Sequence, residues 1–349
     1  MSGIDPVQFA KAWRQKLVDR SNGKFGLGSF TGTVMPDTTS DIFRVFVPVN
    51  PERQRKLNCK FGHKLNIFLD SLFDYPTIIQ AKLESHGTWE QYNRLLTVQV
   101  GGCNFRCWYC YCDDALLKGK NLAYLTPKEL VDRFIQQRIN DYSQGMQSNV
   151  LRISGGEPFL APELILGCLK EIKRRGLDDR IFIWAETNLS PFLKESNSSP
   201  PIVETWVNLD EFAGFRNFAL HPCVHGTSPE NLREITKVDS KWFDGLLEGF
   251  KTLIQRKIDI YPTFSPNMCP PRDVEGLFQK LSSIHEYLPL RFALIEYHLD
   301  YPSVFMRHEA QQHLTVYNKY LVIKKWNELL LKTYGLSYAE KPRQEIPLS

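Results

Sequence analysis

The sequence lacks long apolar runs, a dense disulfide framework and a large excess of one charge. Its 43 lysines and arginines against 39 acidic residues give a net charge of +4, which by itself does not indicate nucleic acid. No stretch reaches the roughly eighteen apolar residues of a membrane helix, and the first seventeen residues lack the apolar core and cleavage site of a signal peptide. We therefore expect a cytoplasmic protein with no membrane partner.

Cysteine is unevenly distributed. Four of the eight cysteines are scattered along the chain, at Cys59, Cys168, Cys223 and Cys269. The other four fall within residues 101–112, GGCNFRCWYCYC, which we call the cysteine loop. No second cysteine cluster occurs in the sequence, so we expect no auxiliary iron-sulfur domain. Scattered thiols without a dense, even framework are typical of a reducing compartment.

The cysteine loop has the spacing C-x3-C-x2-C, at Cys103, Cys107 and Cys110. Three thiolates are one fewer than a closed iron-sulfur cube or a structural zinc site normally takes. One metal corner is therefore expected to stay open for a ligand that is not protein. The loop follows an apolar run at 95–100, so it is predicted to leave the carboxyl end of a buried strand, where barrel enzymes place their chemistry.

The loop resembles the cluster motif of the radical S-adenosylmethionine (radical SAM) superfamily, in which an aromatic residue, here Tyr109, usually precedes the third cysteine. The resemblance implies a [4Fe-4S] cluster on Cys103, Cys107 and Cys110, with the amino and carboxylate groups of SAM on the open iron. An electron from the cluster then cleaves SAM to methionine and a 5′-deoxyadenosyl radical. That radical takes a hydrogen atom from the substrate.

A second motif follows about 45 residues later, where residues 153–158 read ISGGEP. Gly155, Gly156 and Glu157 resemble the GGE motif of the same superfamily, which holds the SAM amino group. Two glycines allow a backbone to approach a ligand closely, and a carboxylate can accept a hydrogen bond from an ammonium group. A plain turn is the alternative interpretation of a Gly-Gly-Glu sequence.

Apolar runs alternate with amphipathic segments from residue 95 onward. Strands are predicted at 95–101, 150–155, 180–185, 218–224, 258–264 and 291–297, and helices at about 126–142, 161–175, 241–257 and 273–287. Repeated strand-helix units favour parallel strands with right-handed crossovers. Six strands match the partial (β/α)6 TIM-like barrel that the resemblance implies. We therefore predict an α/β fold.

Three later strand ends resemble those of glycyl-radical-enzyme activases. Residues 186–188, ETN, are similar to an acidic-Thr-Asn segment beside SAM, and residues 296–298, EYH, to a Tyr-His pair whose histidine contacts SAM. The fourth strand departs from the pattern, because Cys223 and His225 replace an Asp-x-Lys pair, although a histidinium could partly replace the lysine. The resemblance predicts a SAM pocket completed by Glu186, Asn188, His225 and His298.

The predicted core spans 91–306, with an extension at 1–90 that packs on the barrel and a C-terminal helical segment at 307–349. The glycines of residues 22–30, NGKFGLGSF, are interpreted as a turn and not as a phosphate loop, since no strand plainly leads into them and no helix pattern follows immediately. Residues 194–201, KESNSSPP, are predicted to form an exposed loop.

The leading hypothesis is a radical SAM enzyme with one [4Fe-4S] cluster. Its expected partners are an electron donor such as flavodoxin or ferredoxin and an unknown substrate, which could be a small molecule, a peptide or protein, or a nucleoside. A glycyl-radical-enzyme activase is one alternative. A noncatalytic iron-sulfur or zinc protein, in which Cys112 completes a zinc knuckle, is an alternative from another class.

Overall fold

The structure is a computed structural model that describes residues 3–30, 38–46, 94–295, 302–310, 316–338, 341 and 343–348. Most of the predicted N-terminal extension and residues 296–298 therefore lie outside the described residues. His298, the last member of the predicted SAM pocket, is among them.

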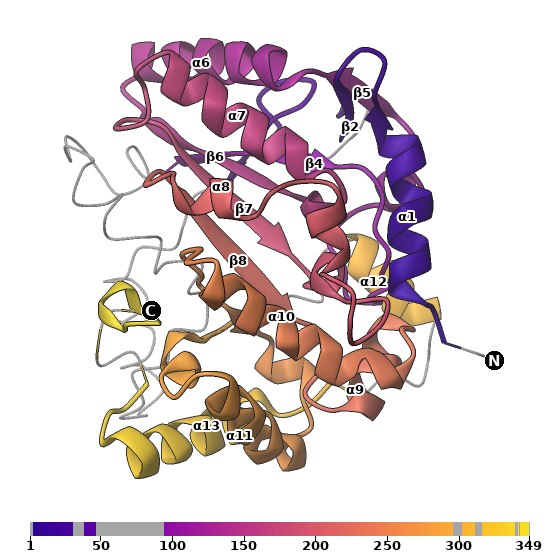
Figure 1. The fold of residues 1–349 in the computed structure, drawn as a ribbon, viewed down its shortest axis with the longest axis vertical. Coiled ribbons are helices and arrows are strands. Elements are labelled where there is room, and N and C mark those ends of the chain that lie inside the picture. Colours follow the sequence, from indigo (N-terminus) through magenta and orange to yellow (C-terminus); the bar gives the residue numbers. More distant parts are fainter. Residues whose placement is uncertain are drawn as a thin grey trace.

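Six parallel strands form the centre of the molecule and pair in chain order (Figure 1). They are β4 (Arg94–Val100), β6 (Ser148–Gly155), β7 (Phe182–Thr187), β8 (Phe218–Val224), β9 (Thr263–Phe264) and β10 (Ala293–Leu294). Each lies within or close to a predicted strand, although the last two are shorter than predicted. The α/β fold with a mostly parallel sheet is confirmed.

Helices connect the successive parallel strands. They are α5 (Asp114–Leu117), α6 (Pro127–Ser143), α7 (Pro162–Arg174), α8 (Asp210–Ala213), α9 (Pro229–Thr236), α10 (Phe243–Gln255) and α11 (Val274–Ile284), followed by α12 (Pro302–Ala310) and α13 (Lys319–Tyr334). In Figure 1, α6 and α7 lie beside each other at one end of the sheet, and α10, α11 and α13 lie at the other. No helix in the described part of the chain combines the length and apolar character that a membrane crossing demands.

Local sequence signals explain where several helices begin. Thr126 caps α6 through a capping box with Glu129, and a proline occupies the first helical position, where its missing N–H costs nothing. Ser228 caps α9 in the same way without the reciprocal glutamate. The apolar faces of α7 and α10 are buried, so both helices are held mainly by packing.

The described N-terminal elements extend the sheet beside the first parallel strand and add a helix that packs on the segments after β6 and β7. These elements are α1 (Pro6–Leu17), β1 (Val18–Asp19), β2 (Lys24–Gly28) and β3 (Arg44–Phe46). Strands β2 and β3 pair antiparallel with β4, and β2 also pairs with β5 (Leu122–Leu125). The glycine-rich segment thus contains a strand that the sequence interpretation did not predict, because Gly26 and Gly28 lie in β2. The turn predicted for this segment lies at Gly23, whose φ is +61°.

Two glycines let the ends of β4 and β6 touch. The amide of Gly156 donates to Val100 O (2.9 Å) and the amide of Glu157 donates to Gly102 O (3.0 Å). A Cβ added at Gly156 would lie 1.6 Å from Gly102 O, and Gly155 has a φ of +105°. Both positions therefore need glycine for the protein's own packing. The close approach of a ligand that the sequence predicts at these glycines stays a prediction.

We predict that Gly156→Ala destabilises the fold strongly, because the clash is with backbone that cannot rotate away. The matched control is Gly276→Ala within α11, where nothing lies within 4 Å of the new Cβ. Alanine is favoured over glycine inside a helix by about 0.8–1 kcal/mol, so the control should keep or raise Tm. Thermal unfolding followed by circular dichroism measures both. Equal Tm values for the two variants would contradict the close contact.

Candidate functional site

The cysteine loop begins where β4 ends and is held from several sides. The Asn104 side chain donates to Pro6 O (2.9 Å) and to Ser190 Oγ (2.6 Å). The amides of Arg106 and Trp108 donate to the last carbonyls of α9, at 2.9 and 3.3 Å. The loop is therefore fixed by α1, by α9 and by the segment after β7.

The three thiols of the C-x3-C-x2-C spacing lie near one another, with Cys103 buried and Cys107 and Cys110 half-buried. Burial raises the pKa of Cys103 to about 12, with a further contribution from the charge of Cys110. Burial also raises the pKa of Cys107 well above its ordinary value, with contributions from Cys103 and Cys110. A cation bound there would stabilise the thiolates against this desolvation. This donor set fits an iron-sulfur cube that takes three protein ligands.

No three Cys, His, Asp or Glu side chains among the described residues are placed to hold a single metal ion. A cube places each thiolate on a different iron, so its ligands need not meet at one point. Cys112 is fully buried beside the Cys110 thiol, and its own thiol donates to Gly155 O (3.2 Å). The Cys112 thiol thus forms a hydrogen bond at the junction between the loop and β6.

Glu157 is completely buried beside this junction. Its carboxylate accepts from the Phe159 amide (2.9 Å), the Thr187 hydroxyl (2.9 Å) and the Asn188 amide (2.6 Å). Burial nevertheless raises the pKa of Glu157 to about 7, since these hydrogen bonds only partly offset desolvation. A carboxylate offers about four lone-pair sites, so room for one further donor remains.

Asn188 lies at the edge of the cysteine loop, as predicted from its position after β7. Its side-chain amide donates to Asn104 Oδ1 (3.1 Å) and lies 3.7 Å from Cys103 Sγ. Its own Oδ1 accepts from the Ser190 amide (2.9 Å). Asn188 therefore connects the end of β7 to the first cysteine.

His225 also reaches the loop. Its Nδ1 lies 2.6 Å from Tyr109 Oη and 3.8 Å from Cys107 Sγ, and its ring stacks on the Tyr109 ring. Burial lowers the pKa of His225 to about 4, because desolvation disfavours the charged form. The sequence allows a histidinium that partly replaces the lysine of activases, and this role of His225 stays a prediction.

Glu186 belongs to a charged network inside the sheet. It forms a buried ion pair with Arg152, accepts from Ser154 Oγ (2.5 Å) and lies 3.8 Å from His221 Nδ1. Tyr111 extends the network, since its hydroxyl is 2.5 Å from Ser154 Oγ. The network therefore connects the cysteine loop to β6, β7 and β8.

The structure thus brings four sets of predicted site residues together: the three cysteines with Tyr109, the Gly155–Glu157 turn, Asn188 and His225. Glu186 is nearby but paired with Arg152, which the sequence interpretation missed. The available sequence signal was an arginine within an apolar run predicted to form a buried strand, because buried charges need partners. In the structure Arg152 is 8% exposed. Arg307, which contacts the loop from α12, carried no sequence signal.

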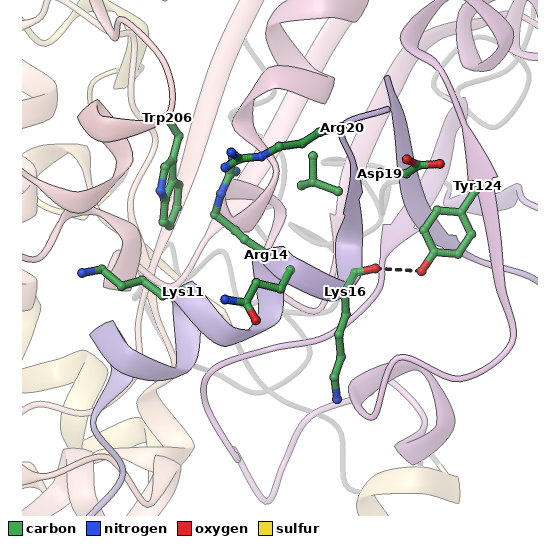
Figure 2. A pocket seen from close by; sticks show the side chains of 9 residues that line it. Lys11, Arg14, Lys16, Asp19, Arg20, Tyr124 and Trp206 are labelled. Atoms are coloured by element: carbon green, nitrogen blue, oxygen red, sulfur yellow. Dashed lines mark hydrogen bonds between the residues drawn. The ribbon is translucent and has the colours of Figure 1, made fainter. Parts of the chain in front are cut away.

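A separate groove of about 940 Å³ lies along α1 (Figure 2). Arg14 points into it with its guanidinium 4.2 Å from the centre of the Trp206 ring, and it is also paired with Glu163. The Tyr124 hydroxyl donates to Lys16 O (2.8 Å) across the groove. No cysteine or histidine lines this groove.

A family model described as the radical SAM superfamily matches residues 98–272, half of the chain. The chain belongs to the radical SAM superfamily. The match begins within β4 and covers both motifs and the strands β6 to β9. This radical SAM protein is accordingly an enzyme, and the noncatalytic alternative is set aside.

One relative is a GTP 3′,8-cyclase of Microcystis aeruginosa, 36% identical over 67 residues, which are 19% of each chain. The chain thus matches about a fifth of that relative's length. Similar solved structures include spore photoproduct lyase with a dinucleoside spore photoproduct (14% identity, TM-score 0.47, 81% of this chain and 91% of that one). Another is Streptococcus suis SuiB bound to precursor peptide SuiA (13% identity, TM-score 0.45, 69% and 45%).

We predict that Glu186→Gln lowers the free energy of unfolding by about 3–5 kcal/mol, because it leaves Arg152 buried without its counter-charge. The control is Arg174→Gln at an exposed pair with Glu171, where 66% of the arginine side chain is exposed and about 0–1 kcal/mol is expected. Urea unfolding measures both. Similar small effects would show that the buried pair contributes no more than the surface pair.

This effect should depend on pH. Arg152 holds the pKa of Glu186 well below its ordinary value despite burial, so the stabilisation is present above the unfolded pKa of about 4.3. It is lost as pH falls below that value towards the folded pKa. The stability gap between wild type and Glu186→Gln should therefore be largest near neutral pH and narrow in acid.

Proposed function

We propose that this enzyme holds one [4Fe-4S] cluster on Cys103, Cys107 and Cys110 and uses it to cleave SAM reductively. The observation that carries the proposal is the placement of three neighbouring thiols, one buried and two half-buried, on one loop that touches the Gly155–Glu157 turn. When bound, such a cluster supplies the electron that breaks a carbon-sulfur bond of SAM and yields a radical able to take a substrate hydrogen atom.

The chain's own residues support this chemistry in three ways. The cysteines supply three thiolates and leave one iron for SAM. The burial of Cys103 and the half-burial of Cys107 and Cys110 limit the contact of water with a reactive radical. Tyr109 and His225 pack beside the second cysteine, and Asn188 beside the first, so the ligands are held by side chains from distant strands.

We also propose that Glu157 accepts a hydrogen bond from the SAM amino group. Its carboxylate retains one lone-pair site after its three internal donors, and it reaches Cys103 through Asn188. In this arrangement Gly155 and Gly156 place the carboxylate by letting β6 pass close to the loop. The electron donor is proposed to be an external reductant of the flavodoxin or ferredoxin class.

We predict that alanine at Cys103, Cys107 or Cys110 abolishes cluster binding, whereas Cys112→Ala retains it. Cys112 donates to Gly155 O, and a fourth thiolate on the cube would occupy the iron that SAM needs. Iron and sulfide content after anaerobic reconstitution measures the outcome. If Cys112→Ala loses its cluster while Cys110→Ala keeps it, the ligand assignment is wrong.

We predict that Glu157→Gln weakens SAM binding about ten- to a hundredfold, since a hydrogen bond to a charged group contributes about 1.5–3 kcal/mol. The iron content should stay at the wild-type level. Glu163→Gln is the control, because that glutamate lies at the start of α7 and pairs with Arg14. SAM affinity is measured by equilibrium dialysis on reconstituted protein. Unchanged affinity in Glu157→Gln would exclude the contact.

A further inference from the structure

Helix α12 lies outside the residues that the superfamily model matches, yet it rests on the cysteine loop. Arg307 donates from Nη1 to Cys110 O and from Nη2 to Cys112 O (2.7 Å). Ser303 Oγ donates to the intervening carbonyl, Tyr111 O, at 2.9 Å. Three consecutive carbonyls at the third cysteine thus find their donors on one helix turn about 190 residues away.

Apolar contacts strengthen the same interface. Val304 is 1% exposed and packs in a cluster with Trp108 and Tyr109. The His308 ring lies 5.6 Å from the Trp108 ring. Positions 303, 304, 307 and 308 share one face of a helix, so α12 presents a single continuous surface to the loop.

The Arg307 guanidinium is also a charge at the cluster site. Its side chain is 16% exposed, so water screens it less than a surface cation. Asp114 accepts from Arg307 Nη2 at 2.6 Å, but this carboxylate is 62% exposed. The acidic partner therefore only partly offsets the positive charge beside Cys110.

Resting on the proposed function, we propose that α12 is a clamp on the third-cysteine end of the loop. Arg307 is its positioning residue: it holds the backbone of Cys110 and Cys112 in place and favours the reduced cluster with its charge. Cluster reduction adds one electron, supplied by an external reductant, and a nearby cation stabilises the product of that step. Nearby charges and hydrogen bonds are established determinants of cluster potential.

The test compares Arg307→Gln and Arg307→Lys with Met306→Gln, a control on the same helix at a side chain that is 65% exposed. In the full-length apoprotein, amide hydrogen exchange within residues 103–113 should accelerate in Arg307→Gln and stay at the wild-type rate in Met306→Gln. This readout needs no cluster. If residues 103–113 exchange their amide hydrogens at the same rate in Arg307→Gln as in Met306→Gln, the proposed clamp is wrong.

The second readout is the ratio of reduced to oxidised cluster at a fixed potential, followed by electron paramagnetic resonance. Arg307→Gln should lower this ratio about tenfold, which corresponds to about 59 mV for a one-electron couple. Arg307→Lys should bring the ratio of reduced to oxidised cluster close to the wild-type value, because lysine keeps the positive charge. Its amide exchange should stay faster than in the wild type, because lysine lacks the planar guanidinium that donates to two carbonyls. An unchanged ratio in Arg307→Gln would overturn the electrostatic part. Failure of the wild-type protein to assemble any cluster would instead refute the proposed function.

Discussion

The site depends on the close contact between the ends of β4 and β6. Gly156 lies against the carbonyl of Gly102, and two backbone hydrogen bonds join the strand ends. This contact sets the cysteine loop directly beside the Gly155–Glu157 turn, so the proposed cluster ligands and the proposed SAM contact share one rigid junction. The Cys112 thiol adds a third connection through Gly155 O. A side chain at Gly156 would push the two motifs apart.

Much of this arrangement is predictable from sequence. The apolar runs before Cys103 and Gly155 were long and uniform enough to identify buried parallel strands, and their order along the chain fixed their order in the sheet. Strand ends of a parallel sheet meet at one edge. The placement of Asn188 and His225 beside the cysteines therefore followed from their positions just after β7 and β8.

What the sequence did not reveal depends on side-chain contacts across the fold. The pairing of Glu186 with Arg152 needs the register between β6 and β7, which sets these residues on facing positions. The lowered pKa of His225 comes from its burial beside Tyr109. Arg307 lies about 190 residues from the loop, so local pattern carried no information about their contact.

The hydrogen-bonding pattern around the loop explains how one short segment can be held without regular structure. Its amides donate to α9, while its carbonyls accept from α12 and from Arg106, whose Nη1 donates to Phe105 O (2.7 Å). Buried backbone groups without partners are costly. The surrounding helices satisfy these groups, so the loop's backbone is held without regular structure.

The most direct measurement is the formation of 5′-deoxyadenosine from SAM by anaerobically reconstituted protein with dithionite as reductant. The account predicts that wild-type protein releases 5′-deoxyadenosine and methionine together, and that protein lacking the Cys107 thiol releases neither. A wild-type protein that carries a reducible [4Fe-4S] cluster and binds SAM, yet leaves it intact, would contradict the central claim.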